Sequence, residues 1–209
     1  VKPIYLWGSG DGAVEVLHIL EDLELYQVCG VVSRHQPEYE SLKAYPFFDV
    51  NDPSYKENIK NTSSAVVTVG DPYMRERMLE EIAEFELQLP VLIHPSTVVA
   101  KDCVIEKGSV IGPQVTISSG VEVKENCYIS FNASVGHHSV IGKHSVISPG
   151  TRIGGSVECG HSVFTGLNAV VVPRVKIGNG SILSAGSLLT KSTNDNVRVI
   201  AGQNRMLQI

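Results

Sequence analysis

The chain has 209 residues, of which 43% are hydrophobic, and a formal net charge of -5 at pH 7. This length allows one large domain or two modest ones with a real core, and the scattered Lys and Arg residues exclude a basic surface for nucleic acid or for an anionic membrane. No apolar run approaches the roughly 20 residues that span a bilayer, so we expect a cytoplasmic protein without membrane insertion.

The segment 1–90 alternates strand-like and helix-like stretches, a pattern typical of a small α/β domain on a parallel sheet. A buried strand runs into a glycine-rich turn and then into an amphipathic helix, with Glu15, Glu21 and Asp22 on its polar side. The expected elements are strands at 4–7, 28–32 and 65–69, the glycine turn at 8–13, a helix after it, a second helix from an N-cap at Asp71 to about Phe85, and a polar segment without a clear pattern at 33–62.

From residue 93 onward the hydrophobic period changes to six, which indicates a repeat architecture. Every sixth position from 93 to 189 holds Ile, Val or Leu, except Cys159 and Thr165. A second register, every sixth position from 97 to 187, holds only Ser, Thr, Ala, Cys or Val. Each unit is therefore a short strand and a corner that contribute one aliphatic and one small side chain to a core shared by stacked units. An antiparallel sandwich predicts a period of two and does not fit.

Glycine often follows the aliphatic position of the repeat. Either a corner with an unusual backbone conformation or a close approach between backbones explains a glycine there. The glycines concerned are Gly112, Gly136, Gly142, Gly154, Gly160, Gly166 and Gly178.

Motifs spread over nearly the whole chain resemble the family of sialic-acid O-acetyltransferases and nucleotide 4-amino-sugar N-acetyltransferases. This resemblance implies an α/β Rossmann-like nucleotide-sugar-binding domain at 1–90 and a left-handed parallel β-helix with hexapeptide repeats at 91–209, in which each triangular coil takes three hexads. The handedness comes from the resemblance alone, because general connection rules favour a right-handed turn. The motifs are GSGDGAVEVL at 8–17, VGD at 69–71 with Arg75, IHPS at 93–96, GHHSVIG at 136–142 and SPGTRIGG at 148–155.

The resemblance assigns the catalytic histidine to His137, two residues after the aliphatic Val135. Acetyl transfer from a thioester to an amine needs a base for the proton that the attacking nitrogen releases, and imidazole suits that task near neutral pH. Stacking with three hexads per coil puts Gly155 beside His137, which predicts space for a ligand. His138 stands where the family usually has an acidic residue that orients the base, so it either assists His137 or is itself the base.

The family binds the nucleotide sugar at the glycine turn, where backbone N–H groups and a helix N-terminus meet a phosphate. Asp11 and Gly12 depart from the usual Gly-His of this turn. Ser33 and Arg34 stand where relatives carry acidic residues, so we expect a different nucleotide or sugar to be recognised. The predicted substrate-binding residues are Gly10, Asp11, Gly12, Ser33, Arg34 and Gly70.

Relatives bind acetyl-CoA along the coil, between two subunits of a homotrimer. The matching positions here are Val146, Gly155, Leu167 and Ala185. Val146 replaces a histidine of the family, and the tail at 201–205 lacks the usual Gly-x-Pro-Ala-Lys. Both departures imply that acetyl-CoA is bound through different contacts.

The remaining histidines and the four cysteines give no sign of a metal site. No two histidines are five residues apart, as a zinc hydrase on the same coil would need, and the cysteines are expected to be reduced structural thiols. We expect His94 to be structural at the entry to the coil. The histidines expected to be solvated are His18, His35, His144 and His161.

We therefore predict an acetyl-CoA-dependent N-acetyltransferase that acts on the amine of a nucleotide-linked 4-amino-sugar. No cysteine or serine motif suggests a covalent nucleophile, so the transfer is expected to be direct. Two alternatives stay open: a sugar O-acetyltransferase of the sialic-acid type, and a non-catalytic nucleotide-sugar-binding trimer. The family implies a role in surface-polysaccharide or glycan synthesis.

Overall fold

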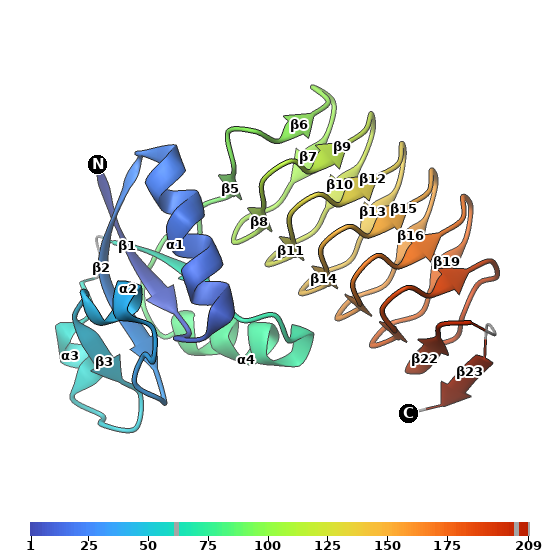
Figure 1. The fold of residues 1–209 in the computed structure, drawn as a ribbon. Coiled ribbons are helices and arrows are strands. Elements are labelled where there is room, and N and C mark those ends of the chain that lie inside the picture. Colours follow the sequence, from blue (N-terminus) through green and yellow to red (C-terminus); the bar gives the residue numbers. More distant parts are fainter. Residues whose placement is uncertain (61–62, 203–204, 209) are drawn as a thin grey trace.

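The computed structural model describes residues 1–60, 63–202 and 205–208. A small α/β part is followed by a long stack of short strands (Figure 1). The α/β part contains β1 (Lys2–Trp7), α1 (Asp11–Leu23), β2 (Tyr26–Ser33), α2 (Glu40–Lys43), β3 (Phe47–Asp49), α3 (Tyr55–Asn58), β4 (Ser64–Val67) and α4 (Pro72–Ile82).

The α/β part is built on a parallel sheet with strand order β3-β2-β1-β4. The chain order reverses beside β1, so the carboxyl ends of β1 and β4 flank the crevice where ligands bind in open α/β sheets. The predicted strands and both long helices are present, although α4 ends at Ile82 rather than near Phe85. The polar segment without a predicted pattern forms α2, β3 and α3.

The two helix starts differ in how they are capped. The Asp71 side chain accepts a hydrogen bond from the Met74 backbone N–H at 2.8 Å, and Pro72 follows at the first helical position, as predicted. α1 instead begins after Gly10, which has no side chain to cap the helix. The first backbone N–H groups of α1 are therefore available to a ligand.

The second part is a parallel β-helix whose strands form three sheets. Sheet I contains β5 (Leu92–Ile93), β8 (Val110–Ile111), β11 (Tyr128–Ile129), β14 (Val146–Ile147), β17 (Phe164–Thr165), β20 (Ile182–Leu183), β22 (Val197–Ile200) and the antiparallel β23 (Arg205–Gln208). Sheet II contains β6 (Val98–Val99), β9 (Thr116–Ile117), β12 (Ser134–Val135), β15 (Arg152–Ile153), β18 (Val170–Val171) and β21 (Leu188–Leu189). Sheet III contains β7 (Val104–Ile105), β10 (Glu122–Val123), β13 (Val140–Ile141), β16 (Glu158–Cys159) and β19 (Lys176–Ile177).

Both registers of the repeat point into the core of the β-helix, as predicted. From β5 to β21, strands pair with the strand three hexads away along the chain, for example Val110 with Tyr128. The aliphatic and small positions together form one buried cluster, and only the first coils are partly open, at Ile93, Val99 and Ile105.

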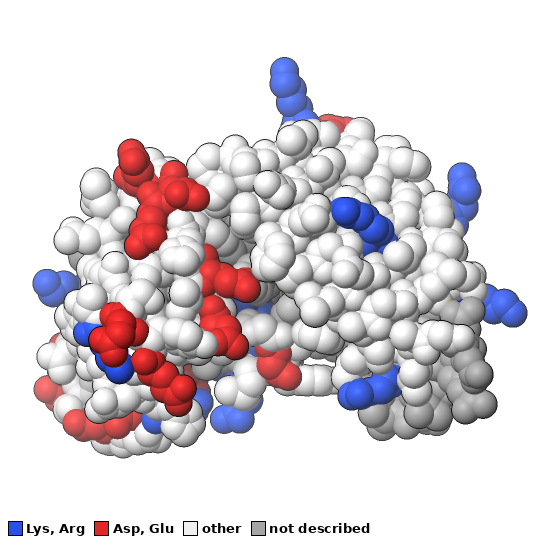
Figure 2. Space-filling view, in the orientation of Figure 1, with Lys and Arg blue, Asp and Glu red and all other residues white. Residues whose placement is uncertain are grey.

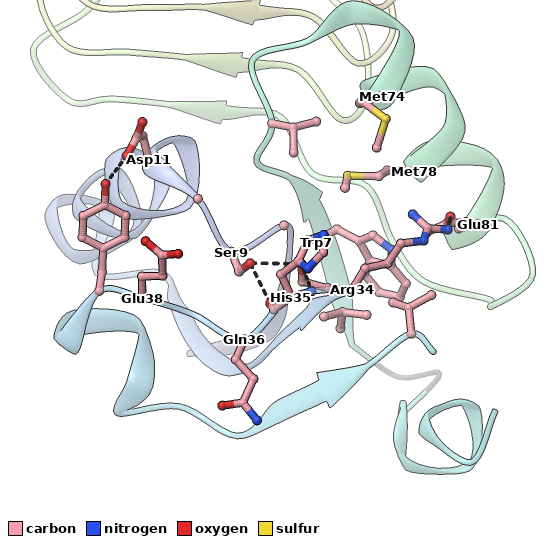
Figure 3. A pocket seen from close by; sticks show the side chains of 17 residues that line it. Trp7, Ser9, Asp11, Arg34, His35, Gln36, Glu38, Met74, Met78 and Glu81 are labelled. Atoms are coloured by element: carbon pink, nitrogen blue, oxygen red, sulfur yellow. Dashed lines mark hydrogen bonds and ion pairs between the residues drawn. The ribbon is translucent and has the colours of Figure 1, made fainter. Parts of the chain in front are cut away.

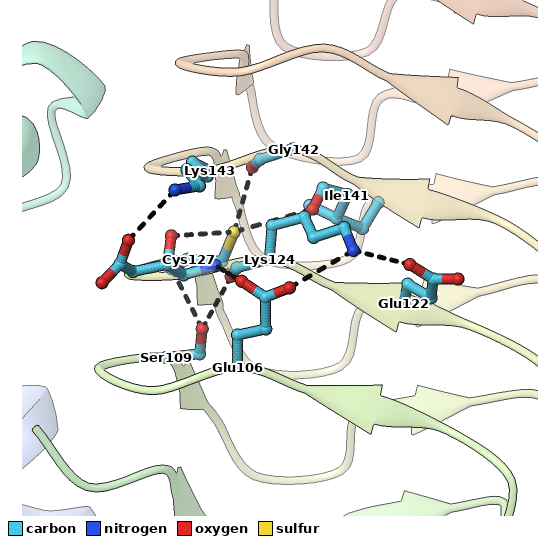
Figure 4. A network of polar contacts seen from close by, with 9 residues as sticks. Glu106, Ser109, Glu122, Lys124, Cys127, Ile141, Gly142 and Lys143 are labelled. Atoms are coloured by element: carbon cyan, nitrogen blue, oxygen red, sulfur yellow. Dashed lines mark hydrogen bonds and ion pairs between the residues drawn. The ribbon is translucent and has the colours of Figure 1, made fainter.

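The small polar residues also connect neighbouring coils through hydrogen bonds. Ser145 Oγ donates to the Gly160 carbonyl and accepts from the Val163 N–H, both at 3.1 Å. Cys127 Sγ donates to the Gly142 carbonyl at 3.1 Å in the same way, beside a surface ladder in which Lys124 pairs with Glu106 and Glu122 (Figure 4). Because exposed ion pairs contribute only about 0–1 kcal/mol each, the buried bonds are the more important link between coils.

The glycines after the aliphatic positions serve close backbone approach. A Cβ added at Gly136 would lie 2.6 Å from the Gly154 carbonyl carbon of the next coil, and a Cβ at Gly142 would overlap the backbone of Gly160. Left-handed backbone occurs two positions later in the corners, at residues such as Asn132 and His138, which has φ 55°. The alternative of an unusual backbone at the glycines themselves is therefore wrong.

The α/β part packs on sheet I, where α1 lies between the parallel sheet and the β-helix (Figure 1). Tyr128 of β11 packs against α1 and donates its hydroxyl to Glu15, so the polar side of α1 at Glu15 contacts the β-helix. Burial is the main cause that raises the pKa of Tyr128, followed by the Glu15 bond. Among the described residues, no helix is long and apolar enough to cross a membrane.

Arg75 of α4 is fully buried at this junction. Its Nε and Nη2 donate to the carbonyl and side-chain oxygens of Asn126, both at 2.9 Å, and Nη1 donates to the carbonyls of Val67 and Val69. Burial lowers the pKa of Arg75 to about 10, which still leaves it charged at neutral pH. This side chain joins β4, α4 and a corner of the β-helix.

Candidate active site

A cavity of about 470 Å³ opens at the carboxyl ends of β1 and β2, beside the end of β4 (Figure 3). We call it the glycine-turn pocket. It is lined by Trp7, Gly8, Ser9, Gly10, Asp11, Val32, Ser33, Arg34, His35, Gln36, Glu38, Tyr39, Val50, Val69, Met74, Met78 and Glu81.

Glycine occurs at the positions of this turn for different structural reasons. A Cβ at Gly12 would overlap the Thr68 carbonyl, so glycine there lets the start of α1 approach the end of β4. Gly8 needs its φ of 123°, which favours glycine. Gly10 and Gly70 have nothing within 4 Å of an added Cβ and face open space. This open space meets the uncapped N-terminus of α1, an arrangement that suits an anion.

A second cavity of about 450 Å³ lies between the α/β part and sheet I, and we call it the interdomain pocket. It shares Gly10 and Asp11 with the glycine-turn pocket and adds Gly12, Gly70 and Tyr128. The six residues predicted to bind the substrate therefore all line one or both of two adjoining cavities.

The charges around these pockets are mostly negative. Figure 2 shows acidic side chains along the edge of the α/β part that faces the hollow, while the visible face of the β-helix is mostly uncharged. Asp11 accepts a hydrogen bond from Tyr39. The hydrogen bond to Asp11 is the main cause that raises the pKa of Tyr39.

The two candidate catalytic histidines are exposed at the corner between sheets II and III, and their rings meet edge to face with centroids 5.3 Å apart. A Cβ added at Gly155 would lie 2.5 Å from His137 Nε2. The predicted free space beside Gly155 is therefore wrong in one respect, because the His137 ring occupies it. His138 lies over Gly120, where an added Cβ would overlap its ring.

An acidic group that the sequence reasoning missed lies at the same corner. Asp102 accepts a hydrogen bond from Ser119 Oγ at 2.7 Å, and this bond is the main cause that lowers the pKa of its carboxyl. The Gly120 backbone N–H and the charge of His138 lower this pKa further. The only sequence signal was the stacking of coils that are three hexads long, which aligns Asp102, Gly120 and His138.

Within one chain, His137 and His138 lie away from the glycine-turn pocket and the interdomain pocket. The α/β part covers sheet I, whereas His137 and His138 occupy the edge of the three-sided coil that joins the other two sheets. That edge is opposite sheet I. A ligand in the interdomain pocket therefore faces a different side of the coil from the histidines of its own chain.

The four predicted cofactor residues also lie apart. Val146 is buried in sheet I against α1 and lines the interdomain pocket, while Gly155 lies under His137. Leu167 and Ala185 lie at the corner between sheets I and II, both exposed, and Ala185 lines a separate cavity of about 380 Å³ that also contains Gly70. Of the tail, Gln203 and Asn204 lie outside the described residues.

Among the four histidines that were predicted to be solvated, one differs from its predicted surroundings. His144 is buried, not solvated, and its Nδ1 lies 3.1 Å from Asn126 Nδ2. His35 is exposed but lines the glycine-turn pocket. His18 and His161 are exposed as expected. His94 contacts Asp22 at 2.7 Å and accepts the Ser96 N–H, which fits a structural role at the entry to the coil.

The cysteine thiols are free, and two of them are buried. Cys127 and Cys159 lie inside the β-helix, where burial raises the pKa of each thiol to about 12. All four cysteines are free. Within the described part of the chain, no three His, Cys, Asp or Glu side chains converge on a possible metal position.

Comparison with known protein families gives two matches that together span most of the chain. Residues 87–197, more than half of it, match the GMPPB C-terminal domain, and residues 3–82 match the PglD N-terminal domain. The chain therefore belongs to the GMPPB C-terminal domain family through residues 87–197 and carries a PglD-type N-terminal domain, and the family resemblance inferred from its motifs is confirmed. A search of curated proteins found no match.

Solved structures share the fold over the whole chain. A histidine variant of perosamine N-acetyltransferase from Caulobacter crescentus, in complex with CoA and GDP-perosamine, has a TM-score of 0.89 at 23% identity and covers 99% of this chain and 97% of that chain. The acetyltransferase domain of PglB from Neisseria gonorrhoeae with acetyl coenzyme A has a TM-score of 0.87 at 23% identity, covering 100% and 99%. WeeI from Acinetobacter baumannii has a TM-score of 0.89 at 18% identity, covering 99% and 100%. The predicted fold, an α/β Rossmann-like domain before a left-handed β-helix, is confirmed.

Proposed function

We propose that the protein is an acetyl-CoA-dependent N-acetyltransferase that acts on the amine of a nucleotide-linked 4-amino-sugar. The observation that carries this proposal is the combination of an open glycine turn at an uncapped helix start with an exposed histidine pair on a hexapeptide-repeat coil. The CoA and GDP-perosamine complexes named for its structural neighbours support the same pair of substrates.

We infer that the active site is completed between copies in a homotrimer. The histidine edge lies opposite the sheet that the chain's own α/β part covers, so a nucleotide sugar needs the histidines of a second copy. Sheet II supports such an interface, because Val98, Val170 and Leu188 on its outer face are 63%, 37% and 45% exposed. Apolar side chains gathered on one face of a sheet favour burial by a partner.

The proposed reaction is a direct transfer. The unprotonated sugar amine attacks the thioester carbonyl, a C–N bond forms, the C–S bond breaks, and CoA leaves as a thiolate that takes up the proton which His137 has removed from the nitrogen. His137 accepts the proton that the nitrogen loses, and a positive charge then develops on its ring. His138 orients that ring in this scheme, and the Asp102 carboxylate stabilises the charge at this corner.

The test follows the release of free thiol from acetyl-CoA with nucleotide 4-amino-sugars and with the corresponding sugars that offer only hydroxyl groups. We expect release with the amines, a loss of about 100-fold or more in kcat for His137→Ala, and a smaller loss for His138→Ala. His161→Ala, which removes an exposed histidine from another corner, is the control.

Each other outcome has a definite meaning. Release with hydroxyl acceptors alone indicates the O-acetyltransferase, and nucleotide-sugar binding without any thiol release indicates the non-catalytic trimer. Full activity of His137→Ala with loss in His138→Ala transfers the role of base to His138. Full activity of both variants contradicts the mechanism.

A further inference from the structure

One wall of the glycine-turn pocket carries an ion pair that the proposed chemistry does not use. Arg34, just after β2, contacts Glu81 of α4 through Nη2 and Oε1. Their side chains are 36% and 20% exposed, so both can reach a ligand in the pocket. Sequence reasoning named Arg34 but missed Glu81, since the two lie far apart in the chain.

The pair lies at the end of the pocket away from the glycine turn. In Figure 3, Asp11 at the start of α1 is on one side of the pocket, and Arg34 with Glu81 is on the other, next to Met74 and Met78. A nucleoside diphosphate whose phosphates meet the N-terminus of α1 therefore directs its base toward this pair. The two methionines offer adaptable apolar contacts for a flat ring.

The two charged side chains offer different hydrogen-bonding groups side by side. Among the described residues, Glu81 Oε2 and Arg34 Nε and Nη1 have no hydrogen-bond partner. An ionised carboxylate only accepts hydrogen bonds, and a guanidinium only donates them. The wall therefore complements a ring edge in which an N–H stands next to a carbonyl, because Glu81 accepts from the N–H and Arg34 donates to the oxygen.

We propose that Arg34 and Glu81 determine base specificity by reading this lactam edge. Uracil, thymine, guanine and hypoxanthine carry it, whereas cytosine and adenine present a bare ring nitrogen beside an amino group. With those two bases, the ring nitrogen faces the carboxylate and the amino group faces the guanidinium, so acceptor meets acceptor and donor meets donor. The inference rests on the proposed function only in taking the ligand to be a nucleotide.

The test measures binding of free nucleoside diphosphates to the whole protein by calorimetry, in two matched pairs. UDP and CDP differ only at this edge, and so do IDP and ADP, so base size is held constant within each pair. If the pocket accepts pyrimidines, we expect UDP to bind at least about tenfold more tightly than CDP. If it accepts purines, we expect the same of IDP over ADP.

Variants test whether the pair causes the preference. Glu81→Gln, whose amide both donates and accepts, is expected to reduce the ratio to within about threefold, and Arg34→Gln is expected to do the same. Glu84→Gln is the matched control, because Glu84 pairs with Lys56 on the surface and does not line the pocket. It should keep the preference of the unmodified protein.

Three results would overturn the proposal. These are equal or tighter binding of CDP and ADP, no measurable binding of any of the four nucleotides, and an unchanged preference in both pocket variants. The preference is measured without acetyl transfer, so it distinguishes the two proposals. A preference for the lactam bases without thiol release supports base reading by Arg34 and Glu81 and contradicts the proposed acetyltransferase activity. Thiol release without such a preference supports the acetyltransferase activity and contradicts base reading.

Discussion

The imidazole of His137 lies in the space that the absent side chain of Gly155 leaves. An added Cβ there would meet only the far end of an exposed side chain, whereas an added Cβ at Gly142 would meet the backbone of the next coil. A side chain can rotate away at small cost, but a stacked backbone cannot move without disturbing its hydrogen bonds. The same substitution therefore has different consequences at these two positions.

We expect Gly155→Ala to leave the melting temperature close to that of the unmodified protein and to reduce acetyl transfer by about tenfold or more, because a misplaced base loses its alignment. Gly142→Ala should lower the free energy of unfolding by about 1–3 kcal/mol, as overpacking does in well-packed interiors. Thermal unfolding and thiol release measure the two effects. Equal destabilisation by both substitutions would contradict this distinction.

At this scale the sequence predicted that Gly155 lies beside His137, but it missed Asp102 at the same corner and did not predict what surrounds each ring. Stacking with three hexads per coil correctly put Gly155 beside His137, yet it left open whether a ligand or the ring itself filled the space. The His138 ring lies near Asp102 because position 120 is a glycine, which leaves room for the ring above it. Such details depend on side-chain rotamers, which a repeat period does not specify.

At the scale of the coil, the small register has two roles. It fits the narrow core, and its polar members also connect one coil to the next, as Ser145 does between the Gly160 carbonyl and the Val163 N–H. Cys127 shows that a thiol can occupy the same place. Ser187 is the exception, because its buried Oγ has no hydrogen-bond partner among the described residues.

We expect Ser145→Ala to lower the free energy of unfolding by about 1–3 kcal/mol, because it leaves a buried carbonyl and a buried N–H without their partner. Ser145→Cys should lose less, and Ser187→Ala should be neutral or slightly stabilising. Urea unfolding of the three variants tests this order. A loss in Ser187→Ala as large as in Ser145→Ala would mean that the hydroxyl bonds between coils are not what the small register contributes.

The hexad period predicted the β-helix and both of its registers because each coil repeats the same local environment. It could not separate a small residue chosen for volume from one chosen for its hydroxyl, since Ala, Val, Ser and Thr occur in the same register. It also left open why glycine follows the aliphatic position. The left-handed backbone falls on polar residues two positions later, such as Asn132, which tolerate it better than most.

At the scale of the whole molecule, the arrangement of the two parts depends on contacts that no local pattern reveals. Arg75 and Asn126 are far apart in the chain, and the amide of Asn126 also lies against His144. A polar residue in a helix or in a corner of the coil is exposed in most proteins, so the prediction that His144 is solvated followed the usual case. The proposed site between copies depends on which sheet the α/β part covers, and no local sequence pattern shows that.

We expect Arg75→Met to lower the free energy of unfolding by about 3 kcal/mol or more, because it leaves several buried carbonyl oxygens without a donor. Proteolysis in the segment 83–91, which joins the two parts, should become faster. Arg77→Met removes an exposed arginine from the same helix and is the control. If Arg75→Met unfolds and is cleaved like this control, the buried arginine does not hold the two parts together.

The same junction should make stability depend on pH through His144. Burial is the main cause that lowers the pKa of His144 from its usual 6.5; Arg75 and Lys143 lower it further, while Glu76 and Glu125 oppose the shift. As the pH falls below about 6.5, the unfolded chain takes up a proton that the folded chain resists, so the unfolded state binds more protons and stability decreases. The neutral His144 ring contributes fully to stability at a pH above the pKa that His144 has in the unfolded chain. This contribution is lost as the pH falls toward the lower pKa that His144 has in the folded protein.

We therefore expect the melting temperature of the unmodified protein to fall further between about pH 7.5 and pH 5.5 than that of His144→Gln, because the variant lacks the titrating ring. Comparing the two proteins cancels the titration of groups common to both. His161→Gln, an exposed histidine one coil further on, should follow the unmodified protein at both pH values. If His144→Gln shows the same pH dependence as the unmodified protein, the buried contact with Asn126 does not resist protonation, and the junction is stabilised by Arg75 and apolar packing alone.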